Sequence, residues 1–499
     1  MEQFKMIVKT LQGLEEVLAK ELSALGAQEI EPGLRMVSFV GDKELMYKAN
    51  FCLRTALRVL KPIKTFEARE AEDVYKAVSQ IEWSDYLDLK TSFAVDSVVY
   101  SEDFKHSKFV AYKVKDAIVD YFREHTGQRP NISVANPDIK LNIHISGNSC
   151  TLSLDSSGES LHKRGYRVAT VESPISEVLA AGMLLLTGWQ GECDLYDPMC
   201  GSGTIAVEAA LLARNIYPGV FHTSKYAFEN WKDFEPELLE KIYNDDSAER
   251  EFVHKIYASD IDPAAVAAAR ANVKSAGVAD VVEVAEKSVQ QFEKPEGKAV
   301  MVTNPPYGER ITAPDLLGLY RAIGEKLKHR FVGNDAWIIS YRQQTFDQIG
   351  LKPSVKIPLY NGSLDCEFRK YQIFDGELKT FRSEGGNIKT DDDIRKMKSK
   401  KPLKPRRDFK DTMYGEPESD NDDIPAYLRI RHRSFMASQK EREAQNERRR
   451  TDYDGDRESF KDGGRHKHRD EHRRDERKST DRKNRSPWAK NSTKKHRYD

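Results

Sequence analysis

Residues 173–378 alternate short apolar runs with helical stretches, and this rhythm limits the possible folds more than any other feature of the chain. Alternating strands and helices predict an α/β domain with a mostly parallel, doubly wound sheet. In such sheets ligands bind at the carboxyl ends of the strands, so the residues after each strand are candidates for a functional site. Strands are expected at residues 194–196, 255–258, 281–284, 299–303 and 336–340.

The first of these strands runs into a glycine-rich turn with an apolar helix behind it. Glycines let a ligand approach the bare backbone, and the helix N-terminus offers N–H donors and the positive end of a dipole. The turn lacks the ending of a P-loop and the full dinucleotide-binding pattern. Taken alone, it fits either a ligand site or a tight structural turn. Its sequence is Asp197-Pro198-Met199-Cys200-Gly201-Ser202-Gly203-Thr204.

Two acidic residues follow the second strand. An acid at this place in a doubly wound sheet accepts hydrogen bonds from ribose hydroxyls, and we expect this role for Asp260. Asp262 directly precedes Pro263, as an N-cap precedes a proline in the first turn of a helix. A purely structural capping role is the alternative interpretation of the pair.

The fourth strand ends in Asn304-Pro305-Pro306-Tyr307. An exocyclic amine on a base is a poor nucleophile because its lone pair is delocalised into the ring. The Asn oxygen and a backbone carbonyl next to proline can accept its protons, while the prolines fix the backbone. The Tyr ring offers a stacking surface for a base that has left its helix. The tetrapeptide therefore favours a site for amine methylation over the alternative, a loop that the prolines merely stiffen.

Two smaller α+β units are expected before this domain, over residues 1–60 and 61–168. In the first, strand patterns at 4–8 and 36–40 flank a helical one. In the second, two alternating runs across Gly147-Asn148 are typical of a hairpin.

Residues 379–499 carry 36 Lys and Arg against 25 Asp and Glu, a net charge of +11, although the whole chain is neutral. These residues contain few large apolar side chains, so we expect a disordered tail. Because residues 1–378 must then be acidic, the basic tail is expected to help the protein associate with nucleic acid.

Cysteine spacing and hydropathy bear on metal binding, on the cellular compartment and on membrane insertion. The five cysteines form no CxxC pair, so neither a structural zinc site nor any other metal is expected, and free thiols fit a reducing compartment. The N-terminus has no secretory pattern, and the longest apolar run is too short to span a bilayer. The expectation is a soluble cytoplasmic protein; the oligomeric state is left open.

Together these motifs resemble the class I S-adenosylmethionine-dependent methyltransferases, whose domain is Rossmann-like. The segments ESPISEVLAAGMLLLTGW, YDPMCGSGTIAVEAAL, YASDIDPAAVAAARANV and NPPYGERI are similar to THUMP-domain RNA methyltransferases, especially the bacterial 23S rRNA guanine-N2 methyltransferases. The resemblance covers residues 1–378. It implies a ferredoxin-like unit at 1–60, a THUMP domain at 61–168, and a methyltransferase domain at 169–378.

The resemblance also implies roles for individual residues. Asn304, Pro305, Pro306 and Tyr307 would hold the target base. Near the usual position of an adenine-binding Asp this chain has Lys287, so Ser288 or Glu286 is expected to substitute. The S-adenosylmethionine site would comprise Asp197, Cys200, Gly201, Gly203, Thr204, Asp260, Ile261 and Ser288.

The THUMP unit implies an RNA substrate, rRNA first, with phosphate contacts from Lys163, Arg164 and Arg167. A solvated linker is the alternative for these three residues. Other functions that fit are methylation of a tRNA guanine, of N6-adenine or of a protein glutamine, and non-catalytic RNA binding in ribosome assembly. The choice of guanine depends on the continuation Gly308-Glu309-Arg310.

Overall fold

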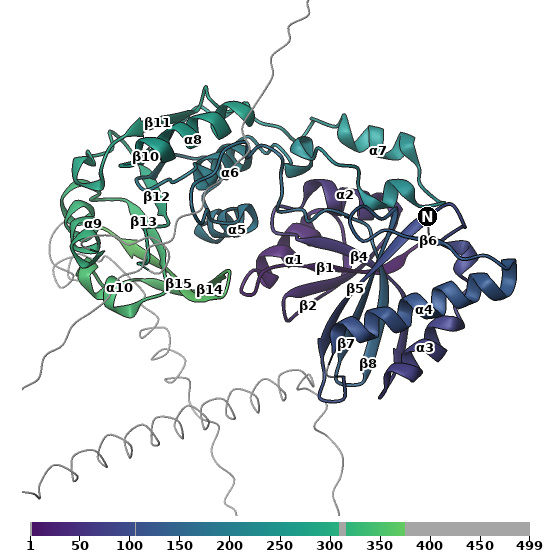
Figure 1. Cartoon of the computed structure of the whole chain (residues 1–499). Coiled ribbons are helices and arrows are strands. Elements are labelled where there is room, and N and C mark those ends of the chain that lie inside the picture. The colour runs from purple at the N-terminus through teal and green to yellow at the C-terminus, as the bar shows by residue number, and fades with distance from the viewer. Residues whose placement is uncertain (1, 105, 309–315, 375–499) are drawn as a thin grey trace, which may run out of the picture. The chain divides into compact units, whose positions relative to one another are not determined.

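The computed structural model describes residues 2–104, 106–308 and 316–374, which form two β-sheets one after the other along the chain (Figure 1). The expected tail at 379–499 lies outside the described residues, and so do Glu309 and Arg310.

The first sheet has eight strands in the order β2-β3-β1-β4-β8-β7-β5-β6. Its helices are α1 (Glu15–Ala24), α2 (Lys43–Cys52), α3 (Ala71–Ser79) and α4 (Ser107–Thr126). Its strands are β1 (Phe4–Lys9), β2 (Gln28–Gly33), β3 (Met36–Gly41), β4 (Arg58–Glu67), β5 (Ser92–Tyr100), β6 (Asn131–Ile132), β7 (Ile139–Ser146) and β8 (Ser149–Asp155).

Strand β4 joins the two N-terminal units that the sequence indicates. Its first residues pair with β1, and from Leu60 onward it pairs with β8. One hydrophobic core runs through both units, from Met6 and Val8 in β1 to Leu141 in β7 and Leu152 in β8. The expected boundary at residue 60 therefore lies inside a strand, and the two units share one sheet.

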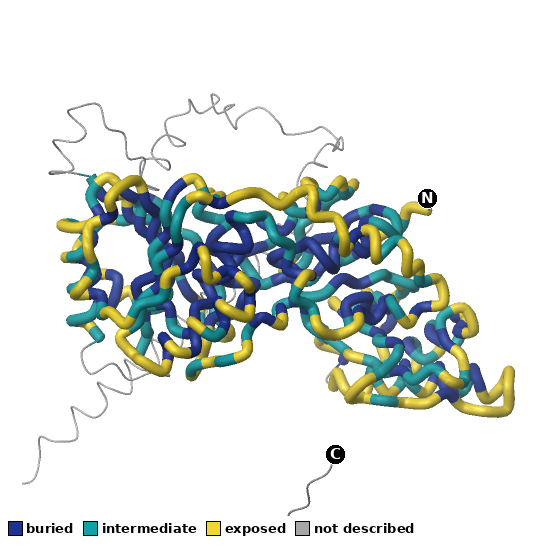
Figure 2. Tube along the Cα trace, turned by 90° about the horizontal axis from the view of Figure 1, so that it is seen from above, coloured by how far each residue is buried: buried dark blue, intermediate teal, exposed yellow. Residues whose placement is uncertain are grey.

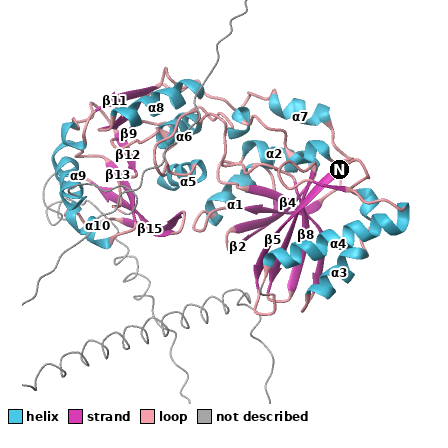
Figure 3. Cartoon of the chain, viewed as in Figure 1, coloured by secondary structure: helices cyan, strands magenta, loops and turns pink. Residues whose placement is uncertain are grey.

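The second sheet has seven strands in the order β11-β10-β9-β12-β13-β15-β14. The first five of these are parallel, and β15 and β14 close the edge with antiparallel pairing (Figure 3). The strands are β9 (Asp194–Asp197), β10 (Ile256–Asp260), β11 (Val282–Glu286), β12 (Ala299–Thr303), β13 (Asp335–Ser340), β14 (Val355–Asn361) and β15 (Leu364–Gln372). The helices are α5 (Glu177–Thr187), α6 (Thr204–Ala213), α7 (Pro236–Tyr243), α8 (Pro263–Ser275), α9 (Leu316–Arg330) and α10 (Gln343–Ile349).

Successive apolar side chains of β12 point to opposite faces of the sheet, and helices cover both faces. Val300 and Val302 belong to a core with α5, α6 and α8, whereas Ala299 and Met301 belong to a second core with α9 and α10. Every residue of α6 is buried, as its mostly apolar sequence requires. Figure 2 shows the buried segments of the described chain mainly in its interior and the exposed ones mainly at its margins. The fold class expected from the sequence, a mostly parallel α/β sheet after an α+β region, is confirmed.

Candidate active site

A cavity of about 510 Å³ opens beside the carboxyl ends of β9, β10 and β12. It brings together the base-site and cofactor-site residues expected from the sequence, with the exception of Gly203. Three parallel strands of one sheet end at the same edge, which is why residues more than a hundred positions apart, such as Asp197 and Asn304, meet here.

The glycine turn adopts a conformation that suits glycine. Gly201 has φ +52° and lines the cavity, so its backbone is open to a ligand. Gly203 has φ +80° and precedes the first residue of α6. A Cβ on Gly203 would lie 3.1 Å from Cβ of Ala269 in α8, so this glycine serves close helix packing and not the cavity wall.

Asp260 is tied to the glycine turn. Its Oδ2 accepts a hydrogen bond from the Gly201 N–H at 2.9 Å, and its Oδ1 accepts one from the Asp262 N–H at 3.0 Å. Asp262 caps α8 by accepting from the Ala264 N–H, as its place before Pro263 indicates. The Asp260 carboxylate is thus fixed at the cavity with further lone pairs for hydroxyl donors.

Asp197 is buried at the end of β9 and lines the same cavity. Its Oδ1 accepts from the Thr303 hydroxyl at 2.8 Å, whereas its Oδ2 is buried without a hydrogen-bond partner among the described residues. Burial raises the pKa of this carboxyl to about 7, with the nearby Asp260 adding to the shift. A cationic ligand group would satisfy the orphan oxygen and favour the carboxylate.

Ile261 lies at the edge of the cavity with 71% of its surface exposed. An apolar side chain in that position gains from being covered by a flat apolar ligand. Beside it, the cavity wall includes Ser288, Val289 and Gln290, but not Lys287, which approaches Glu293 at 3.8 Å. Gln290 was not anticipated from the sequence, and its amide adds a polar group to this part of the cavity wall.

The tetrapeptide after β12 forms another part of the wall. The Tyr307 hydroxyl donates to the Asn304 side-chain oxygen at 2.5 Å, and the Asn361 amide donates to that hydroxyl at 3.5 Å. Burial raises the pKa of Tyr307 well above its usual value. The Pro306 carbonyl accepts from the Tyr320 hydroxyl at 3.4 Å, which holds the proline turn against α9.

The three basic residues expected to contact RNA have different environments. Lys163 is exposed and pairs with Glu159 at 2.7 Å. Arg164 is buried, with 2% of its surface exposed. Its guanidinium donates to the Leu161 and Arg54 carbonyls and forms an ion pair with Glu208. The expected phosphate contact from Arg164 is therefore wrong, and this residue has a structural role.

Arg167 also points into the protein. Its guanidinium donates to the Ile175 carbonyl and the Thr204 hydroxyl, and it pairs with Glu177. These contacts do not fit the expected role in binding phosphate. Sequence alone could not reveal this, because the acidic partners of both arginines come from helices α5 and α6.

Two parts of the cavity wall were missed by the sequence-based interpretation. Residues 171–175 line the cavity ahead of α5, and Asn361, Gly362 and Leu364 reach it from the β14–β15 hairpin. The short turn after Asn361, between two alternating runs, was an available hairpin signal.

Within the described ranges, the side chains form no cluster of three or more His, Cys, Asp or Glu suited to a metal ion. Among those residues, no helix combines the length and the apolar character needed to cross a bilayer.

Comparison with known families gives three matches along the chain. A ferredoxin-like domain described for RlmL matches residues 5–60, a THUMP domain matches 68–155, and an RMKL-like methyltransferase domain matches 164–370.

Individual relatives agree with these matches. The Synechocystis sp. protein named "Putative RNA methyltransferase" is 37% identical over 72% of this chain and 95% of its own length. A ribosomal RNA large subunit methyltransferase K/L of Syntrophotalea carbinolica is 37% identical over 74% of this chain, and the chain spans 53% of that longer protein. A crystal structure titled "a putative methyltransferase complexed with SAH" superposes with a TM-score of 0.68 at 29% identity, covering 76% of this chain and 100% of that one.

Proposed function

Because the chain belongs to the family of THUMP-domain, S-adenosylmethionine-dependent RNA methyltransferases, we propose that it methylates the exocyclic 2-amino group of a guanine in 23S rRNA. The observation that carries the proposal is that Asn304 and Tyr307 line the same cavity as Asp197 and Asp260. One cavity then accommodates both an amine and the cofactor.

The lining residues fit S-adenosylmethionine in charge and shape. Asp260 would accept from the ribose hydroxyls, and the orphan Oδ2 of Asp197 would accept from the ammonium group of the methionine moiety. The exposed side chain of Ile261 would cover one face of the adenine. When bound, the cofactor supplies a methyl group already activated on a sulfonium.

The protein's own contribution is to orient the amine. Asn304 Oδ1 and the Pro305 carbonyl would accept the protons of the amine and so orient its lone pair. Tyr307 stacks on the flipped base and fixes its plane. Alignment supplies most of the acceleration because the donor is already activated, and the proton leaves to solvent after transfer.

The choice of 23S rRNA is supported by the K/L relatives, whose name specifies large-subunit ribosomal RNA. The choice of guanine rests on the resemblance carried by the segment NPPYGERI. This chain spans about half of their length, so it corresponds to one part of those longer enzymes. Methylation of a tRNA guanine or of N6-adenine uses the same amine geometry and would appear as another product of the same site.

Purified protein tests the proposal in vitro. RNA from cells lacking the gene is incubated with S-adenosylmethionine carrying a labelled methyl group, and 23S rRNA and tRNA are separated before digestion to nucleosides. The expected product is labelled N2-methylguanosine from 23S rRNA. Label in tRNA guanosine or in N6-methyladenosine would overturn the assignment while preserving the enzyme class.

A further inference from the structure

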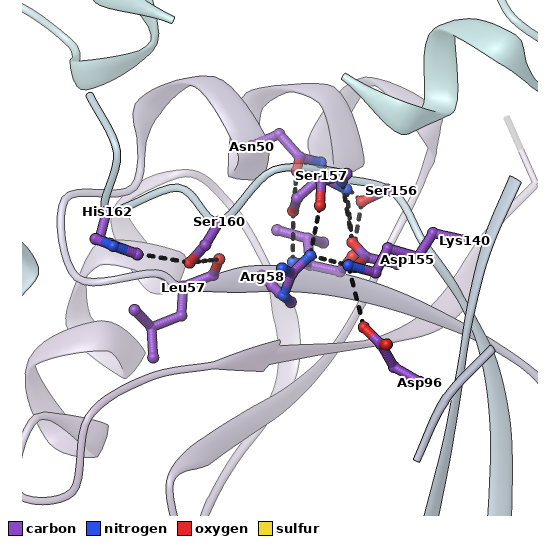
Figure 4. A network of polar contacts seen from close by, with 12 residues as sticks. Asn50, Leu57, Arg58, Asp96, Lys140, Asp155, Ser156, Ser157, Ser160 and His162 are labelled. Atoms are coloured by element: carbon purple, nitrogen blue, oxygen red, sulfur yellow. Dashed lines mark hydrogen bonds and ion pairs between the residues drawn. The ribbon is translucent and has the colours of Figure 1, made fainter. Parts of the chain in front are cut away.

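Residues 156–175, called the linker segment below, connect the first sheet to α5. Its first half is fastened to the N-terminal units (Figure 4). The Ser157 hydroxyl donates to the Asn50 side chain at 2.6 Å, and the Ser156 hydroxyl donates to the Val59 carbonyl at 2.8 Å. The Ser160 hydroxyl donates to Leu57 at 3.3 Å and lies 2.8 Å from the His162 ring nitrogen.

The middle of the linker segment contacts α6, the helix that begins at the glycine turn. Arg164 donates to the Arg54 carbonyl in the N-terminal unit and lies 3.5 Å from the Glu208 carboxylate in α6. The Tyr166 hydroxyl donates to the same carboxylate at 2.9 Å. The segment is thus held on both sides before it reaches the cavity.

Arg167 then reaches two residues of the cavity wall with one guanidinium group. It donates to the Thr204 hydroxyl at 2.9 Å and to the Ile175 carbonyl at 2.9 Å, while Glu177 balances its charge at 3.1 Å. Thr204 and Ile175 both line the cavity, whereas Arg167 does not. The arginine therefore ties the end of the linker segment to the start of α6.

Asn272 in α8 makes a matching connection. Its Oδ1 accepts from the N–H groups of Val168 and Ala169 at 2.9 and 3.0 Å. Its Nδ2 donates to the carbonyls of Ala169 and Ser202 at 2.8 and 2.9 Å. Asn272 is buried, with 1% of its surface exposed, and it satisfies backbone groups of the linker segment and of the glycine turn at once.

We propose that Arg167 and Asn272 are positioning residues of the cofactor site, which hold residues 171–175 against the glycine turn as one wall of the cavity. Neither side chain lines the cavity, so both act through the backbone and through Thr204. A wall fixed in advance spares the ligand the cost of ordering it. The proposal concerns cofactor binding alone and does not depend on which base is methylated.

Calorimetric titration of the full chain with S-adenosylhomocysteine, without RNA, tests this role. Arg167→Lys keeps the charge but loses the planar fork of donors, and Asn272→Asp keeps the shape but loses two donors. Each is expected to weaken S-adenosylhomocysteine binding about tenfold or more. In activity assays the KM for S-adenosylmethionine should rise while kcat changes little.

Two substitutions of the same type serve as controls. Arg250 donates to the Ala213, Gln190 and Leu212 carbonyls, two of them at the far end of α6, and Asn334 accepts from Ala299 N–H. Neither lines the cavity. Arg250→Lys and Asn334→Asp should bind S-adenosylhomocysteine within about twofold of the unmodified protein, even where unfolding temperatures fall equally.

If Asn272→Asp fails to fold, the S-adenosylhomocysteine affinity of the more conservative variant Arg167→Lys tests the proposal. The proposal is overturned if folded Arg167→Lys binds S-adenosylhomocysteine like the unmodified protein, or if the control variants lose as much affinity. A methylated product other than N2-methylguanosine from the unmodified protein would count against the proposed function and would leave the role of these two positioning residues unaffected.

Discussion

The Tyr307 hydroxyl donates to the Asn304 side-chain oxygen at 2.5 Å, so two residues of the proposed base site are hydrogen-bonded to each other. That oxygen is the acceptor that we assign to the target amine. Because an amide oxygen has two lone pairs, a bound amine can share Asn304 Oδ1 with the tyrosine hydroxyl or displace it. Asn361 is a second partner for that hydroxyl in either case.

Asn304→Ala should separate cofactor binding from chemistry. The side chain removed is the acceptor for the amine, while Asp197 and Asp260 stay in place. We expect kcat to fall about a hundredfold or more, by analogy with the loss of one oriented hydrogen-bonding group at a reacting centre. S-adenosylhomocysteine affinity, measured by calorimetry, should stay unchanged; full methyl transfer by this variant would rule out the assigned role.

Tyr307→Phe and Tyr307→Ala should differ strongly. Phenylalanine keeps the ring that stacks on the base and loses only the hydroxyl bonded to Asn304. Because base stacking on an aromatic ring contributes about 1–3 kcal/mol, alanine should reduce kcat/KM for RNA about 5- to 150-fold. Tyr307→Phe should reduce kcat/KM for RNA much less. Equal losses in the two variants would show that the hydroxyl, and not the ring, matters.

The cofactor affinity should depend on the ionisation of Asp197. Its pKa is raised to about 7 by burial, so it is mostly protonated below that pH and offers no carboxylate to an ammonium group. Between pH 7 and 5.5, S-adenosylhomocysteine binding should weaken by up to about tenfold per pH unit. Asp197→Asn should bind weakly with a flat profile, whereas an unchanged slope in this variant would assign the titration to another group.

Gly203→Ala should destabilise the methyltransferase domain. The substitution combines a positive φ with a Cβ contact of 3.1 Å to Ala269, which is tight enough that α8 must shift by a few tenths of an ångström. Gly277 also has a positive φ, +66°, but has open space around it, so Gly277→Ala isolates the backbone strain. Chemical denaturation should show Gly203→Ala to be less stable than Gly277→Ala by about 1–3 kcal/mol. Equal stabilities would mean that α8 can move away at no cost.

Deleting residues 379–499 should weaken RNA binding and reduce its dependence on salt. The removed segment carries a net charge of +11, and each phosphate contact that it makes releases counterions. Binding measured from about 50 to 200 mM salt should give a shallower slope for the shortened chain. An unchanged slope would show that residues 1–378 make all the phosphate contacts.

The strand ends were predictable because local sequence determines them. Short apolar runs followed by Gly201, Asp260 or Asn304 give both the parallel sheet and the residues at its carboxyl edge. The start of α8 after Asp262 was equally predictable, since an N-cap followed by proline is a local signal.

The inward direction of Arg164 and Arg167 was not predictable in this way. Basic residues in a linker usually lie exposed, and only tertiary packing brings Glu208 and Glu177 to them. The same holds for β4, which no local signal marks as shared between two units. Contacts between distant segments, and not local propensity, decide each of these features.

Nucleoside mass spectrometry of cellular RNA tests the central claim most directly. 23S rRNA from a strain lacking the gene is compared with RNA from the same strain complemented by the intact gene or by the Asn304→Ala variant. The account predicts that one N2-methylguanosine is missing from 23S rRNA without the gene, returns with the intact gene and stays missing with Asn304→Ala. Unchanged N2-methylguanosine in 23S rRNA from all three strains would contradict it.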